Sequence, residues 1–297
     1  MPDLGFIGAG TVGTALAVRL NSKGYPVVAV SSRSRSSAGK LAERVKGCAV
    51  MNSSQEVADA AELVFITTPD DAIASVAEQV KWRRGQGVIH CCGSESTDIL
   101  APAGKAGART GVFHPLQSFA SVERALENIP GSTVTIEAEP PLLETLKAIT
   151  VALDAHWIEL TAAARVVYHA SAVFACNYLV TLEKLAADLW QTFGIPRQQA
   201  IRALLPLIRG TIRNIETVGI PGCLTGPIAR GDIKTVRKHL DALKEAAPDL
   251  LSTYRELGLK TIPVALDKGK IDGRRAKELE AVLTGTKEKF TEATGGR

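Results

Sequence analysis

The chain has 297 residues, of which 45% are hydrophobic, and a formal net charge of +4 at pH 7. This length allows two ordinary domains, and the apolar fraction is enough to form buried cores. Because the charge is small and the basic residues are scattered, we expect no nucleic-acid partner. No segment reaches the ~18 uninterrupted apolar residues that a membrane span needs, and no signal-peptide pattern is present, so we expect a cytoplasmic protein without membrane binding. The five cysteines show no CxxC pair and no zinc-ligand spacing, so no metal site is predicted.

The first predicted element is an apolar strand at residues 4–7, followed by a glycine-rich turn and a helix. Gly8, Gly10 and Gly13 form a GxGxxG pattern in this strand, turn and helix context. Gly8 permits the tight turn, Gly10 lets the backbone approach a pyrophosphate, and Gly13 allows close packing of helix on strand. The phosphates would then meet free N–H groups at the positive end of the helix. The predicted cofactor contacts of this turn are Gly8, Ala9, Gly10, Thr11, Val12 and Gly13.

A second apolar strand at 26–30 ends where NAD-binding proteins usually place an acid that binds the adenine ribose. Here the sequence reads Ser-Ser-Arg-Ser-Arg at 31–35, and no Asp or Glu occurs between Asp3 and Glu43. Guanidinium and hydroxyl groups hold a 2′-phosphate through charge-assisted hydrogen bonds, whereas a carboxylate would repel it. We therefore predict NADP(H) over NAD(H), although an ordinary solvated basic loop is the alternative. The predicted contacts are Ser31, Ser32, Arg33 and Arg35.

Further strands are predicted near 48–51, 62–67, 87–92, 109–113, 132–137 and 155–159, with helices between most of them. This alternation is typical of a doubly wound, mainly parallel sheet. Ligands of such sheets bind outside the carboxyl ends of the strands. The turn after the strand at 62–67 should therefore line the cofactor cleft near the nicotinamide, with contacts from Thr67, Thr68, Pro69 and Asp70.

After residue 161 the pattern becomes helical, with helices predicted at about 162–191, 197–217, 232–245, 247–257 and 273–291. The predicted fold class is thus α/β, with an N-terminal doubly wound Rossmann domain followed by an all-α C-terminal domain. We place the NADP-binding domain at 1–160 and a helical domain for substrate binding and dimerisation at 161–297.

Ser94 and His114 follow two predicted strands and are the first catalytic candidates. Reduction of a carbonyl needs a proton donor and groups that polarise the oxygen, and a histidine beside a hydroxyl suits both. Alternatively, Ser94 caps the helix that begins near Thr97, and His114 is a loop histidine bonded to backbone.

His169 and Asn177 are two further candidates, on the predicted helix 162–191. They are eight residues apart and would share a broad helical face, about 12 Å apart along the axis. Small residues between them would let this helix approach the nicotinamide closely. A satisfied core histidine and a structural asparagine are the alternative.

Three arginines of the helical half, at 202, 209 and 213, could anchor a substrate carboxylate, because guanidinium matches carboxylate geometry. A fourth, at 230, could reach a cleft. For Arg202, Arg209 and Arg213 a solvated helix face is the favoured interpretation, and the sequence does not decide the position of Arg230.

Several motifs together resemble the Rossmann-like proteins that carry a DUF2520 C-terminal domain. The matching segments are GFIGAGTVG at 5–13, TTPDD at 67–71, CGS at 92–94, HPLQSF at 114–119, YHASAVFACNY at 168–178 and LTGPIARGD at 224–232. The resemblance covers nearly the full length and implies kinship with pyrroline-5-carboxylate reductases and F420-dependent NADP oxidoreductases. It also implies a helical domain similar to the C-terminal domain of 6-phosphogluconate dehydrogenases and, by analogy, a homodimer.

The resemblance implies a reaction class and leaves the substrate open. Relatives that act as ketopantoate reductases suggest reduction of a small carboxylate-bearing keto substrate by NADPH, with 2-dehydropantoate as the concrete candidate. Those enzymes place a Lys and an Asn four residues apart on a helix, but here no Lys occurs between Lys147 and Lys184. Ser94 and His114 are instead similar to a Ser and a His-Pro of prephenate dehydrogenases, so we expect His114 or His169 to be the proton donor. An imine reductase of the pyrroline-carboxylate type and a non-catalytic NADP(H) sensor are the alternatives.

Overall fold

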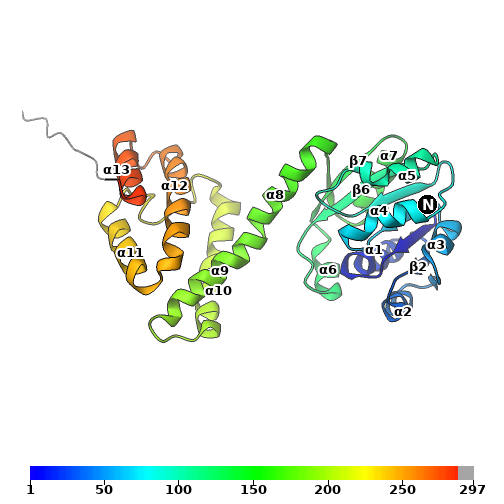
Figure 1. The fold of residues 1–297 in the computed structure, drawn as a ribbon, viewed down its shortest axis with the longest axis horizontal. Helices are drawn as coiled ribbons and strands as arrows, with labels where there is room; N and C mark the ends of the chain where they lie inside the picture. The colour runs from blue at the N-terminus through cyan, green and yellow to red at the C-terminus, as the bar shows by residue number, and fades with distance from the viewer. Residues whose placement is uncertain (287–297) are drawn as a thin grey trace, which may run out of the picture. The chain divides into compact units, whose positions relative to one another are not determined.

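The computed structural model describes residues 1–286. These residues form two compact units, one over Met1–Asn177 and one that begins at Tyr178 (Figure 1). The strand pattern ends at Glu159, near the domain boundary predicted at residue 160, and the first unit continues through one further helix.

The first unit is built on an eight-stranded sheet in the order β3-β2-β1-β4-β5-β6-β7-β8. All neighbouring strands are parallel except β6 and β7, which are antiparallel. The fold class predicted from the sequence is confirmed. The strands are β1 Leu4–Ile7, β2 Val27–Ser31, β3 Ala49–Val50, β4 Leu63–Ile66, β5 Gly87–His90, β6 Arg109–Leu116, β7 Thr133–Ala138 and β8 His156–Glu159.

Helices connect the strands and cover both faces of the sheet, as a parallel sheet requires. Along β1, Leu4 and Phe6 belong to one core cluster and Ile7 to the other, because successive side chains of a strand point to opposite faces. The helices are α1 Thr11–Ser22, α2 Arg35–Arg44, α3 Ser54–Ala60, α4 Asp70–Gln79, α5 Ala101–Lys105, α6 Val122–Asn128, α7 Leu142–Ala152 and α8 Arg165–Ala175, with short 3₁₀ turns η1 Thr97–Leu100 and η2 Ala162–Ala164.

Strand β6 is longer than the sequence predicted, because it continues through His114 and Pro115 to Leu116. Pairing with β5 ends at the His90–Val112 register, so the last residues of β6 pair only with β7. A proline is tolerated there because its missing N–H faces an unpaired edge. His114 therefore projects from a strand and not from a loop.

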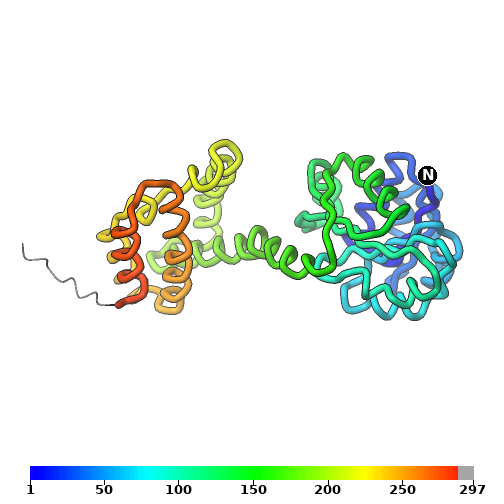
Figure 2. Tube along the Cα trace, turned by 90° about the horizontal axis from the view of Figure 1, so that it is seen from above, coloured from blue at the N-terminus to red at the C-terminus, as the bar shows by residue number. Residues whose placement is uncertain are grey.

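The second unit is helical throughout its described residues, as predicted. Its helices α11, α12 and α13 pack around a core that includes Val236, Ile262 and Leu279 (Figure 1, Figure 2). The helices from the unit boundary onward are α9 Asn177–Gln191, α10 Arg197–Val218, α11 Ile233–Ala246, α12 Leu251–Asp267 and α13 Gly273–Thr284, with a 3₁₀ turn η3 Pro248–Leu250. None of the helices within residues 1–286 is long and apolar enough to cross a membrane.

Two helix predictions were wrong and one extends beyond the described residues. The segment predicted as one helix at 162–191 is interrupted at Cys176 (φ −115°, ψ −67°), because α8 ends at Ala175 and α9 begins at Asn177. No Gly or Pro marks this break in the sequence. The helix predicted at 247–257 runs on to Asp267 and includes Pro263. Of the helix predicted at 273–291, residues 287–291 lie outside the described residues.

Candidate functional site

The turn between β1 and α1 has the backbone geometry that its three glycines predict. Gly8 has φ +114°, and a Cβ there would lie 2.6 Å from the backbone of Thr67. The Thr67 hydroxyl donates to the Gly8 carbonyl at 2.8 Å, which ties the end of β4 to this turn. A Cβ at Gly13 would lie 2.6 Å from the Gly8 carbonyl, so only glycine lets α1 pack this closely.

Gly10 differs from the other two glycines because a Cβ there would meet no atom of the described residues within 4 Å. It is the N-cap of α1, is exposed, and supplies no side-chain cap to the first helical turn. The N–H groups of that turn are therefore available to an external anion, which the positive end of the helix favours.

A cavity of about 500 Å³ opens beside this turn, at the carboxyl ends of β1, β2 and β4. Two hydroxyl oxygens that belong to its lining residues, Ser31 Oγ and Thr68 Oγ1, are buried without a hydrogen-bond partner among residues 1–286. Buried polar atoms normally have a partner, so the lining is suited to a polar ligand. The predicted cofactor contacts that line the cavity are Gly8, Ala9, Gly10, Ser31, Ser32, Arg33, Thr67, Thr68 and Pro69.

The remaining predicted cofactor contacts lie near the cavity without lining it. Thr11, Val12 and Gly13 form the first turn of α1, and Asp70 begins α4. The fifth is Arg35, whose Nη1 donates to Asn52 Oδ1 at 2.6 Å.

The basic residues after β2 are placed as a 2′-phosphate site would need. Arg33 is exposed and lines the cavity, and Asn52, the partner of Arg35, lines it as well. No acidic side chain of the described residues lines this cavity. The residues present therefore fit NADP(H): amide groups for the pyrophosphate, and guanidinium and hydroxyl groups for the extra phosphate.

A second polar cluster forms where β5 and β6 end, and it joins His114 to residues of α8. His114 Nδ1 lies 2.8 Å from the Tyr168 hydroxyl, and the two rings meet edge to face at 82°. The ring of His169 lies 6.1 Å from that of His114. Two sequence-predicted candidates, His114 and His169, are thus brought together.

Gly93 lies against the rings of both histidines. A Cβ at Gly93 would lie 2.7 Å from His169 Cδ2 and 2.9 Å from His114 Nε2. Both imidazoles consequently pack directly on the backbone just beyond β5. This is the strand edge at which ligands of doubly wound sheets bind.

His114 carries no charge at neutral pH. Burial, and after it the neighbouring His169 and Arg165, lower the pKa of His114 to about 4, although Asp70 acts in the opposite direction. One ring nitrogen therefore carries a hydrogen and the other is an acceptor. In this state His114 can donate a hydrogen bond to a ligand oxygen but is not an imidazolium acid.

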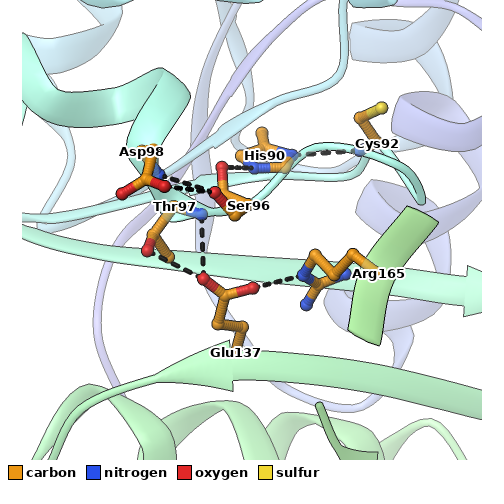
Figure 3. A network of polar contacts seen from close by, with 7 residues as sticks. All are labelled: His90, Cys92, Ser96, Thr97, Asp98, Glu137 and Arg165. Carbon is orange, nitrogen blue, oxygen red and sulfur yellow. Dashed lines mark hydrogen bonds and ion pairs between the residues drawn. The ribbon is translucent and has the colours of Figure 1, made fainter. Parts of the chain in front are cut away.

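A buried ion pair joins Arg165 on α8 to Glu137 on β7 (Figure 3). The Arg165 side chain is fully buried, and its Nε donates to Glu137 Oε2. The other carboxylate oxygen, Oε1, accepts from the backbone N–H and the hydroxyl of Thr97, at 3.0 and 2.9 Å. Arg165 Nη1 and Nη2 have no partner within residues 1–286. This guanidinium is therefore only half paired.

His90 has a structural position in the same network (Figure 3). Its Nδ1 accepts the N–H of Cys92 at 3.2 Å, so Nε2 carries the hydrogen and donates to the Ser96 carbonyl at 3.1 Å. Burial lowers the pKa of His90 to about 4, which keeps it neutral. These bonds hold the turn that carries Gly93.

The other catalytic candidates are less closely tied to the cluster. Ser94 Oγ lies 3.4 Å from Cys92 Sγ. It does not cap η1, since the Ser96 side chain accepts from Asp98 N–H there. Asn177 is exposed and begins α9 beyond the turn at Cys176, so the spacing argument that linked it to His169 through one helix is wrong. Arg202, Arg209, Arg213 and Arg230 are exposed residues of the second unit.

The sequence did not single out Gly93, Glu137, Arg165 or Tyr168. Tyr168 precedes a candidate histidine, and Glu137 is an acid inside an apolar strand, but their partners are 54 and 28 residues away in the chain. An acid within a predicted core strand is the one signal that could have indicated a buried cation.

Two family models match the chain. A Rossmann-like domain model matches residues 2–115, and a domain of unknown function, DUF2520, matches residues 132–261. The chain therefore carries a Rossmann-like domain followed by a DUF2520 domain, and the resemblance seen in the sequence is confirmed. No match is found among proteins of curated function.

Solved structures share this architecture. The "putative NADP oxidoreductase BF3122" from Bacteroides fragilis is 28% identical, with a TM-score of 0.72 over 88% of this chain and 98% of that one. Protein TM1727 from Thermotoga maritima is 25% identical, with a TM-score of 0.73 over 90% and 100%. A reductive aminase from Aspergillus terreus, in complex with NADPH and ethyl levulinate, is 15% identical, with a TM-score of 0.64 over 97% and 100%. The fold of this chain is that of NADP-binding oxidoreductases.

Proposed function

We propose that this protein is an NADP(H)-dependent oxidoreductase that reduces a small keto substrate bearing a carboxylate, with 2-dehydropantoate as the first candidate. The observation that carries the proposal is the cavity at the β1–α1 turn, which combines an open helix N-terminus at Gly10, two buried hydroxyls without a partner in the described part of the chain, and Arg33. The similarity to NADP oxidoreductase structures supports it.

The chemistry would take place where β5 and β6 end. A bound reduced nicotinamide would supply the hydride. His114 would donate a hydrogen bond to the substrate oxygen and so stabilise the negative charge that develops there. His169 and Ser94 would complete the wall of the substrate site, and Gly93 would fix the positions of the two imidazoles.

Reduction of an imine is a second candidate. An iminium substrate already carries its proton, so a neutral His114 would be no disadvantage. The shared fold with a reductive aminase is consistent with this alternative.

The test is consumption of NADPH by the purified protein with 2-keto acids, including 2-dehydropantoate, and with cyclic imines such as pyrroline-5-carboxylate. Turnover of a keto acid that falls at least tenfold in His114→Gln supports the proposal. His156→Gln, which alters an exposed histidine of β8, is the matched control. Turnover of imines alone would favour the alternative. Tight NADPH binding without any turnover would indicate a sensor.

We also propose that the protein is a homodimer assembled through its helices. Large apolar side chains on α9 and α10 are exposed, among them Val180 (68%) and Leu207 (67%). Exposed apolar surface of this extent marks interaction sites. Sedimentation velocity should give a species of twice the chain mass, and Val180→Lys combined with Leu207→Lys should shift it toward monomer. A wild-type monomer at micromolar concentration contradicts the proposal.

A further inference from the structure

We propose that Tyr168 and His114 form a proton relay. In it, the Tyr168 hydroxyl replaces the proton that His114 gives to the substrate oxygen, and the buried Arg165 guanidinium stabilises the resulting tyrosinate. The inference rests on the proposed carbonyl reduction and assigns two further residues, Tyr168 and Arg165, to the same site.

The first support is the contact between Tyr168 and His114. The distance of 2.8 Å from Tyr168 Oη to His114 Nδ1 is that of a well-formed hydrogen bond. The two rings are nearly perpendicular, with their centroids 5.8 Å apart, which is a favourable edge-to-face contact. The pair is thus held by packing as well as by the hydrogen bond.

The second support is the direction of this hydrogen bond. His114 is neutral, and burial raises the pKa of Tyr168 above its ordinary value, so the phenol also keeps its hydrogen. The Thr135 side chain, and after it the charge of Arg165, act on the pKa of Tyr168 in the opposite sense and favour negative charge on its oxygen. A cation near that oxygen favours the arrangement in which Tyr168 donates and Nδ1 accepts. His114 Nε2 then carries the hydrogen.

The third support is where Nε2 points. An ideal Cβ on Gly93 would lie 2.9 Å from His114 Nε2, so this nitrogen faces the backbone just beyond β5. The relay therefore runs from Tyr168 on α8, through the imidazole, to the strand edge at which a substrate would lie.

The fourth support is the half-paired state of Arg165. Both carboxylate oxygens of Glu137 already accept hydrogen bonds, from Thr97 and from Arg165 Nε, while Arg165 Nη1 and Nη2 are buried without a partner among residues 1–286. A buried guanidinium with free N–H groups is costly unless it stabilises an anion. A transient tyrosinate at Tyr168 is the anion that the relay would create.

The protons and charges of the step balance. As the carbonyl carbon gains hydride, its oxygen takes the proton from His114 Nε2. The Tyr168 O–H bond breaks as Nδ1–H forms. The imidazole stays neutral and changes tautomer, and the negative charge ends on the Tyr168 oxygen. After the alcohol leaves, a proton from water returns to Nε2 and the Nδ1 proton returns to Tyr168.

The charged and titratable groups that surround His114 come from four other elements. They are His90 on β5, Glu137 on β7, Asp70 on α4, and Arg165, Tyr168 and His169 on α8, with His114 itself on β6.

The second unit contains a matched control for the Tyr168 hydroxyl. His239 Nδ1 lies 2.8 Å from the Tyr254 hydroxyl, with the rings at 83°, so the same kind of pair occurs on α11 and α12. Tyr168→Phe should lower kcat about 100-fold, the lower range for a general acid, while the Kd for NADPH stays within twofold of wild type. Tyr254→Phe should keep the wild-type kcat. Equal kcat in wild type and Tyr168→Phe overturns the relay.

Variants of Arg165 distinguish the proton relay from a merely structural role of Tyr168. Arg165→Lys keeps the charge and should retain more than a tenth of the wild-type kcat. Arg165→Met removes the charge, so its kcat should be as low as that of Tyr168→Phe. Equal kcat in the two Arg165 variants, with unchanged melting temperatures, contradicts the assigned role of the charge.

A further measurement uses the wild-type protein without cofactor or substrate, so its result does not depend on turnover. Nitrogen-15 spectra of the histidine-labelled protein at pH 7 should show His114 as the Nε2–H tautomer. The Nδ1–H tautomer or an imidazolium overturns the relay whether or not a substrate is reduced. The Nε2–H tautomer in a protein that reduces no carbonyl compound supports the hydrogen-bond direction and contradicts the proposed function instead.

Discussion

Replacement of Gly93 by alanine tests whether the two histidines must occupy their observed positions. The added Cβ would lie 2.7 Å from His169 Cδ2 and 2.9 Å from His114 Nε2, whereas ordinary contacts of this kind are 3.4–4 Å. If the backbone holds, the rings must therefore move by about 0.5–1 Å. A misplacement of about 1 Å costs on the order of 100-fold in rate, and overpacking costs about 1–3 kcal/mol of stability.

We expect Gly93→Ala to lower kcat/KM about 100-fold, with little change in the Kd for NADPH, because Gly93 does not line the cofactor cavity. Steady-state kinetics and NADPH fluorescence titration measure the two quantities. Gly104→Ala is the control, since a Cβ there would meet only Thr110 Cγ2, at 3.8 Å. Wild-type kinetics for Gly93→Ala would refute the reasoning, and so would an equal loss in Gly104→Ala.

Two further predictions concern the cofactor turn and the buried histidine. Gly10→Val should leave the melting temperature within about 2 °C of wild type, because an added Cβ meets no atom of residues 1–286 within 4 Å and the φ of −77° suits any residue. It should raise the Kd for NADPH more than tenfold, because the side chain would fill the space through which the phosphates reach the turn. An unchanged Kd would argue against phosphate binding there. The unfolding free energy should fall as pH drops from 6.5 to 4, since His90 is protonated near pH 6.5 only when unfolded. At 1.36 kcal/mol per pKa unit, His90 accounts for about 3 kcal/mol of this loss. Urea unfolding at pH 7 and pH 4.5 measures it, and His90→Asn should show a smaller pH dependence than wild type; an equal dependence would contradict the assignment.

The sequence predicted well what local patterns determine. All eight strands were expected. The clearest are buried parallel strands such as LGFI at 4–7 and LVFI at 63–66, which are continuous apolar runs between helical segments. The tight turn at Gly8 and the close helix packing at Gly13 follow from the same local context, and the structure shows both. The approach of a pyrophosphate at Gly10 stays a prediction.

What the sequence could not predict depends on contacts between distant residues. The partner of His114 is 54 residues away, and Glu137 meets Thr97 40 residues before it and Arg165 28 residues after it. The break at Cys176 carries no proline or glycine, so helical propensity alone continues through it. Periodicity identifies which face of an element is buried, but it does not identify which polar groups meet there.

The most direct test of the account is calorimetric titration of the purified protein with NADPH and with NADH. The account predicts tight binding of NADPH, at least tenfold weaker binding of NADH, and loss of this preference in Arg33→Glu, because the guanidinium at the cavity would pair with the 2′-phosphate. Equal affinity for the two dinucleotides would contradict the phosphate assignment. The absence of binding to either would contradict the redox function as a whole.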